Sequence, residues 1–178
     1  MKLIFAKFNT SLIVFSVLFL AACSGEQGAQ SESTSETTEE VQSSSIQTHE
    51  VTGVVDGYLK IKDALVASKA DEARQIAISM VDIADAGDMP QVIQAVTEIS
   101  NTTDLEAQRE HFEHFSTSLY EQIKNGKELD QTLYQQYCPM AFDNKGAYWL
   151  SAQEEIRNPY FGDRMLKCGR VQEALSAN

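Results

Sequence analysis

The sequence lacks the short motifs that mark the common classes of enzyme. It has no Cys-x-x-Cys pair for thiol exchange, no His-Glu-x-x-His zinc motif, no glycine-rich phosphate loop and no Gly-x-Ser-x-Gly nucleophile turn. Carboxylates are plentiful, but their spacing singles out no acid–base pair. We therefore predict that the protein is not an enzyme.

Basic residues are scarce. Lys and Arg number 14 against 26 Asp and Glu, which gives a formal net charge of −12. Because nucleic acid requires a basic surface, this balance excludes nucleic acid as a partner. An acidic surface is compatible with handling cations, although most acidic proteins are acidic for solubility alone.

The sequence also has no apolar run long enough to cross a membrane as a helix. The run from Leu12 to Ala22 has about 11 residues, whereas a span needs about 20. Two lysines precede it, and Cys23 follows two alanines, as in a lipoprotein signal peptide. We expect residues 1–22 to be removed and Cys23 to carry lipid, which anchors the protein to the periplasmic face of a bacterial membrane. Ser24, in place of aspartate, favours the outer membrane; a generic secretory peptide is the alternative.

The stretch after the cysteine has no Lys or Arg. Residues 24–50 contain six glutamates, and Ser, Thr, Gln and Gly fill most of the remainder. Such a segment buries too little apolar surface to offset the entropy of ordering it. We therefore predict that residues 23–50 are a lipidated cysteine and a disordered acidic tether, and that residues 51–178 form one folded domain.

Between Val54 and Asn125, apolar residues recur at steps of three and four. This pattern predicts four helices, the second ending at Gly87 and the third starting at Pro90. Thr103 with Glu106 predicts a capping box for the fourth. Since the connections are short, neighbouring helices should run antiparallel in an up-and-down four-helix bundle.

The C-terminal part is rich in aromatic residues instead. Residues 134–142 and 147–150 flank a turn at 143–146, whose glycine suits a positive φ. The predicted fold class is therefore mainly α, an up-and-down four-helix bundle with a small C-terminal β-hairpin and loop segment packed on it.

Only three cysteines are present, and Cys23 is assigned to lipid. Cys138 and Cys168 then remain in an oxidising compartment. Met140 stands two residues after Cys138, on the same face of an extended strand, and Met165 stands three residues before Cys168, on one face of a helical turn. Thiolate and thioether ligands together select Cu(I).

Other interpretations of the same residues remain open. The two cysteines could form a plain disulfide that closes about 31 residues and stabilises the fold by roughly 3–4 kcal/mol, or stay unpaired. Met140 and Met165 could fill the core. Trp149 could shield a bound cation with its ring face. His111 lies at the edge of the apolar stripe of its helix and His114 points almost directly away from it, and both are predicted to be solvated. Residue chemistry alone favours the disulfide.

The chain resembles a bacterial domain family of unknown function, number 3347. The resemblance is densest in the C-terminal runs Tyr137–Phe142, Gly146–Ser151, Ile156–Asp163 and Met165–Gly169, and it extends to Tyr58–Val66 and Gln108–Glu110. Members of that family occur as freestanding lipoproteins and as fusions to CusB-type adaptors of heavy-metal efflux systems.

The resemblance implies a link to copper or related metal export. It carries over to Cys138, Met140, Met165 and Cys168, which match the Cys-Pro-Met and Met-x-x-Cys elements of the family. With it, a soft-metal site, most simply Cu(I), becomes the preferred interpretation, and a CusB-type adaptor or another envelope protein becomes the expected partner. The alternative is a disulfide-stapled module of the cell envelope that binds protein and no metal.

Overall fold

The computed structural model describes residues 37–177 of the chain. The predicted signal peptide, Cys23 and the first part of the predicted tether lie outside the described residues. Within the described part, no helix is both long and apolar enough to cross a membrane.

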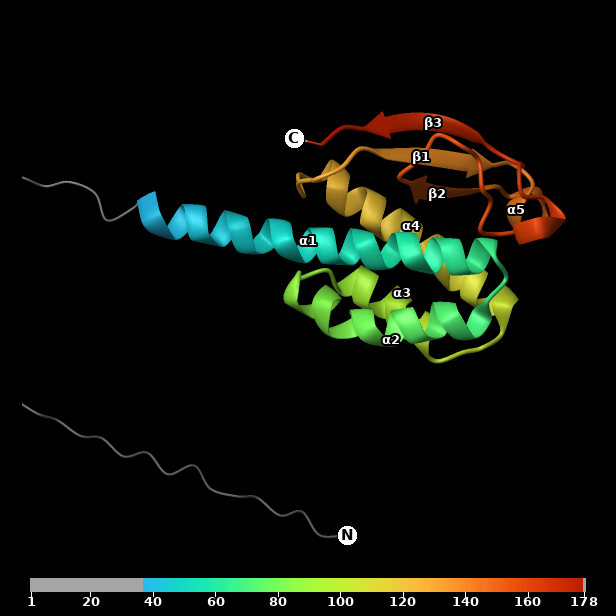
Figure 1. The fold of residues 1–178 in the computed structure, drawn as a ribbon, viewed down its shortest axis with the longest axis horizontal. Helices are drawn as coiled ribbons and strands as arrows, with labels where there is room; N and C mark the ends of the chain where they lie inside the picture. The colour runs from blue at the N-terminus through green and yellow to red at the C-terminus, as the bar shows by residue number, and fades with distance from the viewer. Residues whose placement is uncertain (1–36, 178) are drawn as a thin grey trace, which may run out of the picture. The chain divides into compact units, whose positions relative to one another are not determined.

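Four helices form the first part of the fold. They are α1 (Thr37–Val66), α2 (Ala70–Ala86), α3 (Pro90–Ser100) and α4 (Leu105–Lys124). Each helix packs against the next along the chain, and α1 also contacts α4, so the four close into a bundle (Figure 1). The mainly helical, four-helix fold predicted from the sequence is confirmed.

The core of the bundle is joined to the C-terminal part by an aromatic cluster. The ring of Tyr58 on α1 stacks on Phe112 of α4 at 4.8 Å and meets Phe115 edge-on at 4.9 Å. The hydroxyl of the buried Tyr58 shares a hydrogen bond with Ser116 at 2.7 Å and accepts the backbone N–H of Leu150 at 2.9 Å. This contact fixes the position of the second strand against the bundle.

Helix α1 begins earlier than the sequence indicated. Residues 37–50, predicted as part of the tether, are helical in the structure. Starting a helix is costly because several residues are ordered for one hydrogen bond, whereas extending an existing helix adds a hydrogen bond with each residue. The packed part of α1 therefore allows the helix to continue into a polar sequence that would not form one alone.

The start of α4 also differs from the prediction. Asp104, and not Thr103, caps the helix, with its carboxylate accepting the backbone N–H of Ala107 at 2.8 Å. The carboxylate of Glu106, the other half of the predicted capping box, instead accepts a hydrogen bond from Arg109 at 2.8 Å. The capping-box prediction was wrong because Asp is an equally good cap one residue closer to the helix.

The C-terminal part is a three-stranded antiparallel sheet. Its strands are β1 (Leu133–Cys138), β2 (Ala147–Ser151) and β3 (Arg170–Leu175), in the order β2-β1-β3. The predicted hairpin is the β1–β2 pair, and β3 is an addition that the sequence analysis did not predict. The sheet lies against the bundle, where β2 contacts α4 (Figure 1).

The hairpin turn is tight and contains the short helix α5 (Ala141–Asn144). Phe142, Asp143 and Asn144 all have positive φ, and so does Gly146 at φ 81°. A Cβ on Gly146 would lie only 2.1 Å from the hydroxyl oxygen of Tyr137. The predicted need for glycine in this turn is thus confirmed, since both its φ and its closeness to Tyr137 require it.

A buried arginine joins the bundle to the loop between β2 and β3. The Arg109 guanidinium donates to the carbonyl of Pro159 at 2.9 Å and to the Ser68 hydroxyl at 3.2 Å, beyond the end of α1. Burial lowers the pKa of Arg109, and the neighbouring Glu106 carboxylate opposes that shift. Arg109 therefore anchors the loop that carries Cys168.

Candidate metal centre

The structure brings the two candidate cysteines together. Cys138 is the last residue of β1, and Cys168 stands just before β3, which pairs with β1 through Tyr137 and Arg170. The two Sγ atoms are 3.0 Å apart, and both thiols are free. The sequence left open whether these two sulfurs lie close together. The pairing of β3 with β1 brings them together.

A buried asparagine holds Cys168 in place. The side chain of Asn158 donates to the carbonyl of Cys168 at 2.7 Å and accepts the backbone N–H of Tyr160 at 2.8 Å. The backbone N–H of Asn158 donates to the carbonyl of Leu166 at 2.9 Å. These bonds close the 158–168 loop on itself and bring its end to the sheet.

Gly169 allows the loop to approach the sheet closely. A Cβ at this position would lie 2.8 Å from the end of the Trp149 ring and 3.1 Å from the carbonyl oxygen of Tyr137, and the φ of Gly169 is 151°. The fully buried Trp149 ring thus packs against the residue next to Cys168. Trp149 forms part of the floor beneath the loop, and its indole N–H has no hydrogen-bond partner.

The two methionines adjoin the thiol pair through their backbones. The backbone N–H of Met140 donates to the Cys168 sulfur. The carbonyl of Met165 accepts the backbone N–H of Cys168 at 3.0 Å. The side chain of Met140 is exposed and that of Met165 is half-buried. The geometry therefore joins two sulfurs directly and places both methionine backbones at their side.

The pKa of the Cys168 thiol is raised by its surroundings. The hydrogen bond with Cys138 is the main cause that raises the pKa of Cys168 to about 11; burial and the charge of a Cys138 thiolate add to it, and the Met140 N–H opposes it. Because a metal binds the thiolate, ligation must displace a proton from Cys168.

The donor set fits a soft ion with few ligands. In residues 37–177 no group of three or more His, Cys, Asp or Glu side chains is arranged to hold a metal. A structural zinc site, which takes four such ligands, therefore finds too few. Two thiolates with thioether help are the soft ligands that select Cu(I).

The spacing of the sulfurs suits neither a bound metal nor a disulfide without a small movement. Metal–thiolate bonds of about 2.3 Å put two sulfurs on one ion up to about 4.6 Å apart. A disulfide requires about 2.05 Å. From 3.0 Å, the pair must open for an ion or close for a disulfide. The backbone of Cys168 is held by its loop, but its side chain is the less buried of the two, so that side chain is the one with room to move.

The two histidines predicted to be solvated lie on α4. His114 is on the surface, with 69% of its side chain exposed. His111 is partly buried, and its ring is 3.0 Å from the Glu98 carboxylate of α3.

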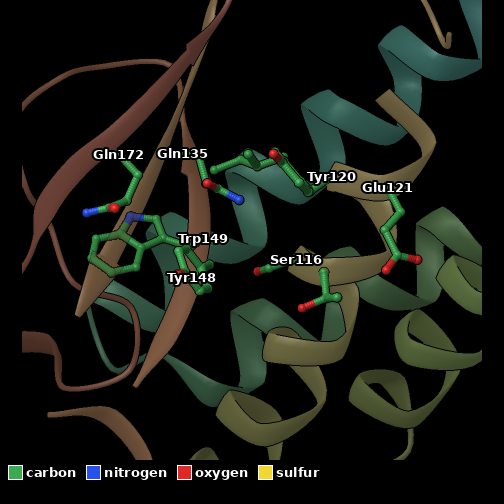
Figure 2. Close-up of a pocket in the computed structure, with 9 residues that line it drawn as sticks. Ser116, Tyr120, Glu121, Gln135, Tyr148, Trp149 and Gln172 are labelled. Atoms are coloured by element: carbon green, nitrogen blue, oxygen red, sulfur yellow. The ribbon is translucent and has the colours of Figure 1, made fainter. Parts of the chain in front are cut away.

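A separate cavity of about 410 Å³ lies between α4 and the sheet. Figure 2 shows Ser116, Tyr120 and Glu121 on the α4 side and Gln135 on the sheet side. The Tyr120 hydroxyl donates to Glu173 at 2.8 Å, which raises the pKa of Tyr120. The residues described as lining this cavity carry no thiol, thioether or imidazole, so it is no site for a soft metal.

Sequence analysis missed the residues that position the pair. These residues are Asn158 and Gly169, and no pattern in the sequence singled out either of them. An Asn-Pro step is a signal for a local turn, but nothing in it points to a carbonyl ten residues away.

Comparison with curated proteins and with solved structures finds no match to this chain. The match to a family begins in α1 and ends before β1, so it covers the helical bundle and leaves out the segment with Cys138 and Cys168. Residues 54–131 match the model of the family described as "Protein of unknown function (DUF3347)".

Proposed function

We propose that this protein binds Cu(I), or another soft cation, through the thiolates of Cys138 and Cys168, with Met140 and Met165 as assisting ligands. The observation that carries the proposal is the 3.0 Å separation of two free thiols. Two such sulfurs are the minimum that a soft monovalent ion needs, and the resemblance of the chain to a family linked to metal export favours that ion.

The site also allows a metal to enter and leave. Cys168 is partly exposed and lies at the end of a loop, whereas Cys138 is fully buried in the sheet. A metal bound between them has one fixed and one movable ligand. This suits a protein that buffers Cu(I) or transfers it in heavy-metal homeostasis or efflux, with a CusB-type adaptor or another envelope protein as the recipient.

The proposed location follows from the N-terminal sequence. Lipid on Cys23 would anchor the protein to the periplasmic face of a bacterial membrane, with the outer membrane favoured by Ser24. A protein anchored on that face of the membrane would handle metal outside the cytoplasm.

A second candidate function is a disulfide-stapled module that binds an envelope protein. The observation that favours it is an exposed aromatic pair: the rings of Tyr137 and Tyr148 lie 4.5 Å apart, and Tyr148 is 43% exposed. The Arg170 guanidinium lies 5.3 Å from the Tyr137 ring centre. Aromatic and arginine side chains are common at protein interfaces.

An anaerobic Cu(I) competition titration on the reduced protein tests the proposal. We expect one tightly bound Cu(I) per chain and no comparable affinity for zinc, since the thiol pair is the only soft donor set proposed. A free-thiol count on protein isolated without reductant is the parallel measurement. No binding after reduction, together with thiols that were paired on isolation, would favour the stapled module instead.

We also predict that the Cu(I) affinity rises with pH. The pKa of Cys168 is raised to about 11, mainly by its bond to Cys138, so at lower pH each Cu(I) must displace at least this proton. Loss of one proton on binding gives about a tenfold rise in affinity per pH unit. The rise should level off near pH 11, and a pH-independent affinity between pH 6 and 8 would contradict ligation by a protonated thiol.

A further inference from the structure

The side chains around the thiol pair differ strongly in their exposure to solvent. Cys138 is fully buried, whereas Met140, two residues later, is 48% exposed. Cys168 is intermediate between them. Solvent therefore reaches the Met140 side chain most freely and Cys168 in part, whereas the Cys138 sulfur is covered.

Met140 is also attached to the pair at close range. Its backbone N–H donates to the Cys168 sulfur, and the exposed Pro139 fixes the backbone between Met140 and Cys138. The backbone of Met140 is thus held at the pair, while its side chain, which has three rotatable bonds, is exposed to solvent.

We propose that Met140 is the entry ligand of the site, through which Cu(I) passes from a soft-ligand carrier to Cys168 and Cys138. The proposal rests on the Cu(I) function proposed above. The bond between Cu(I) and a carrier ligand breaks as the bond to the Met140 sulfur forms. The Cys168 sulfur then replaces a second carrier ligand as its proton leaves to solvent, and the oxidation state of copper does not change.

The chemistry of a thioether suits this role. It binds Cu(I) as a neutral ligand, so it can accept the ion without losing a proton, whereas a thiol must be deprotonated first. A neutral thioether also holds the ion less firmly than a thiolate, which allows the ion to move on. Met165, which is half-buried and precedes Cys168, has no comparable access to solvent.

The test is a stopped-flow measurement of Cu(I) transfer to the reduced full-length mature protein. The donor is the Cu(I) complex of bicinchoninate, and the loss of its colour reports transfer. We expect Met140→Leu to lower the transfer rate constant by about tenfold or more, and to lower the equilibrium affinity by a smaller factor. Ile78→Leu, at an equally exposed apolar side chain on α2, is the matched control and should leave the transfer rate unchanged.

A rescue variant makes the assignment specific. Met140→His restores a donor that binds copper, so it should return the transfer rate towards that of the unaltered protein. An unchanged rate in Met140→Leu, or equal slowing in Met140→Leu and Ile78→Leu, would overturn the entry role while Cu(I) binding itself remained established. Failure of the unaltered protein to bind Cu(I) would instead overturn the proposed function.

Discussion

Replacing Cys138 or Cys168 by alanine is expected to lower the Cu(I) affinity by about a thousandfold or more, which corresponds to about 4 kcal/mol of binding free energy. The reason is the small number of ligands. No cluster of three or more His, Cys, Asp or Glu side chains in residues 37–177 can replace a lost thiolate. The measurement is an anaerobic competition titration against a Cu(I) chelator of known affinity.

Two controls separate loss of the ligand from loss of the fold. Cys168→Ser keeps the size of a partly exposed side chain and exchanges only sulfur for oxygen, so its affinity should fall as far as that of the alanine variant. Thermal unfolding of each reduced variant reports on stability independently. If both alanine variants kept the full affinity, the metal site would lie elsewhere.

The same variants distinguish the stapled module. If Cys138 and Cys168 form a disulfide in the isolated protein, its loss removes about 3–4 kcal/mol of stability in the chain-entropy account of such a loop. The reduced unaltered protein lacks the disulfide just as the variants do, so all of them would then have similar unfolding temperatures. A metal site predicts the opposite pattern, in which Cu(I) stabilises the unaltered reduced protein and leaves the variants unchanged.

The helices and the hairpin could be predicted because their sequences carry a clear period. In α3, for example, Val92, Val96 and Ile99 are buried at the spacing that the sequence indicated. Strand β3 could not be predicted, because only Leu175 at its end is buried and most of its other residues are exposed. A strand held by backbone pairing along one edge has no apolar alternation for the sequence to reveal.

The candidate site was predictable in its residue types and not in its geometry. Cys138 and Cys168 are 30 positions apart, and a chain of that length permits a meeting without requiring it. What decides the meeting is a set of specific contacts: the pairing of β3, the clamp of Asn158 and the close approach at Gly169. Each depends on tertiary neighbours that no local pattern encodes.

The helical residues that carried the resemblance have a structural role. The side-chain amide of Gln108 donates to the carbonyls of Ala70 and Thr102, both at 2.9 Å, and so joins two interhelical connections. The next residue, Arg109, joins the end of α1 to Pro159. A bundle built in this way holds the backbone of the loop with Cys168 in place.

The position of Cys168 depends on the loop that Asn158 closes. Asn158→Ala should lower the stability of the reduced protein by about 2–3 kcal/mol, because it leaves the buried Tyr160 N–H and the part-buried Cys168 carbonyl without their side-chain partner. The same change should weaken Cu(I) binding by about 10- to 100-fold, as loss of a group that orients a metal ligand does. Urea unfolding and the Cu(I) titration measure the two effects, with Arg157→Ala as the exposed neighbouring control. If Asn158→Ala lost stability but kept its Cu(I) affinity, the ion itself would be sufficient to place Cys168, and the loop would serve the fold alone.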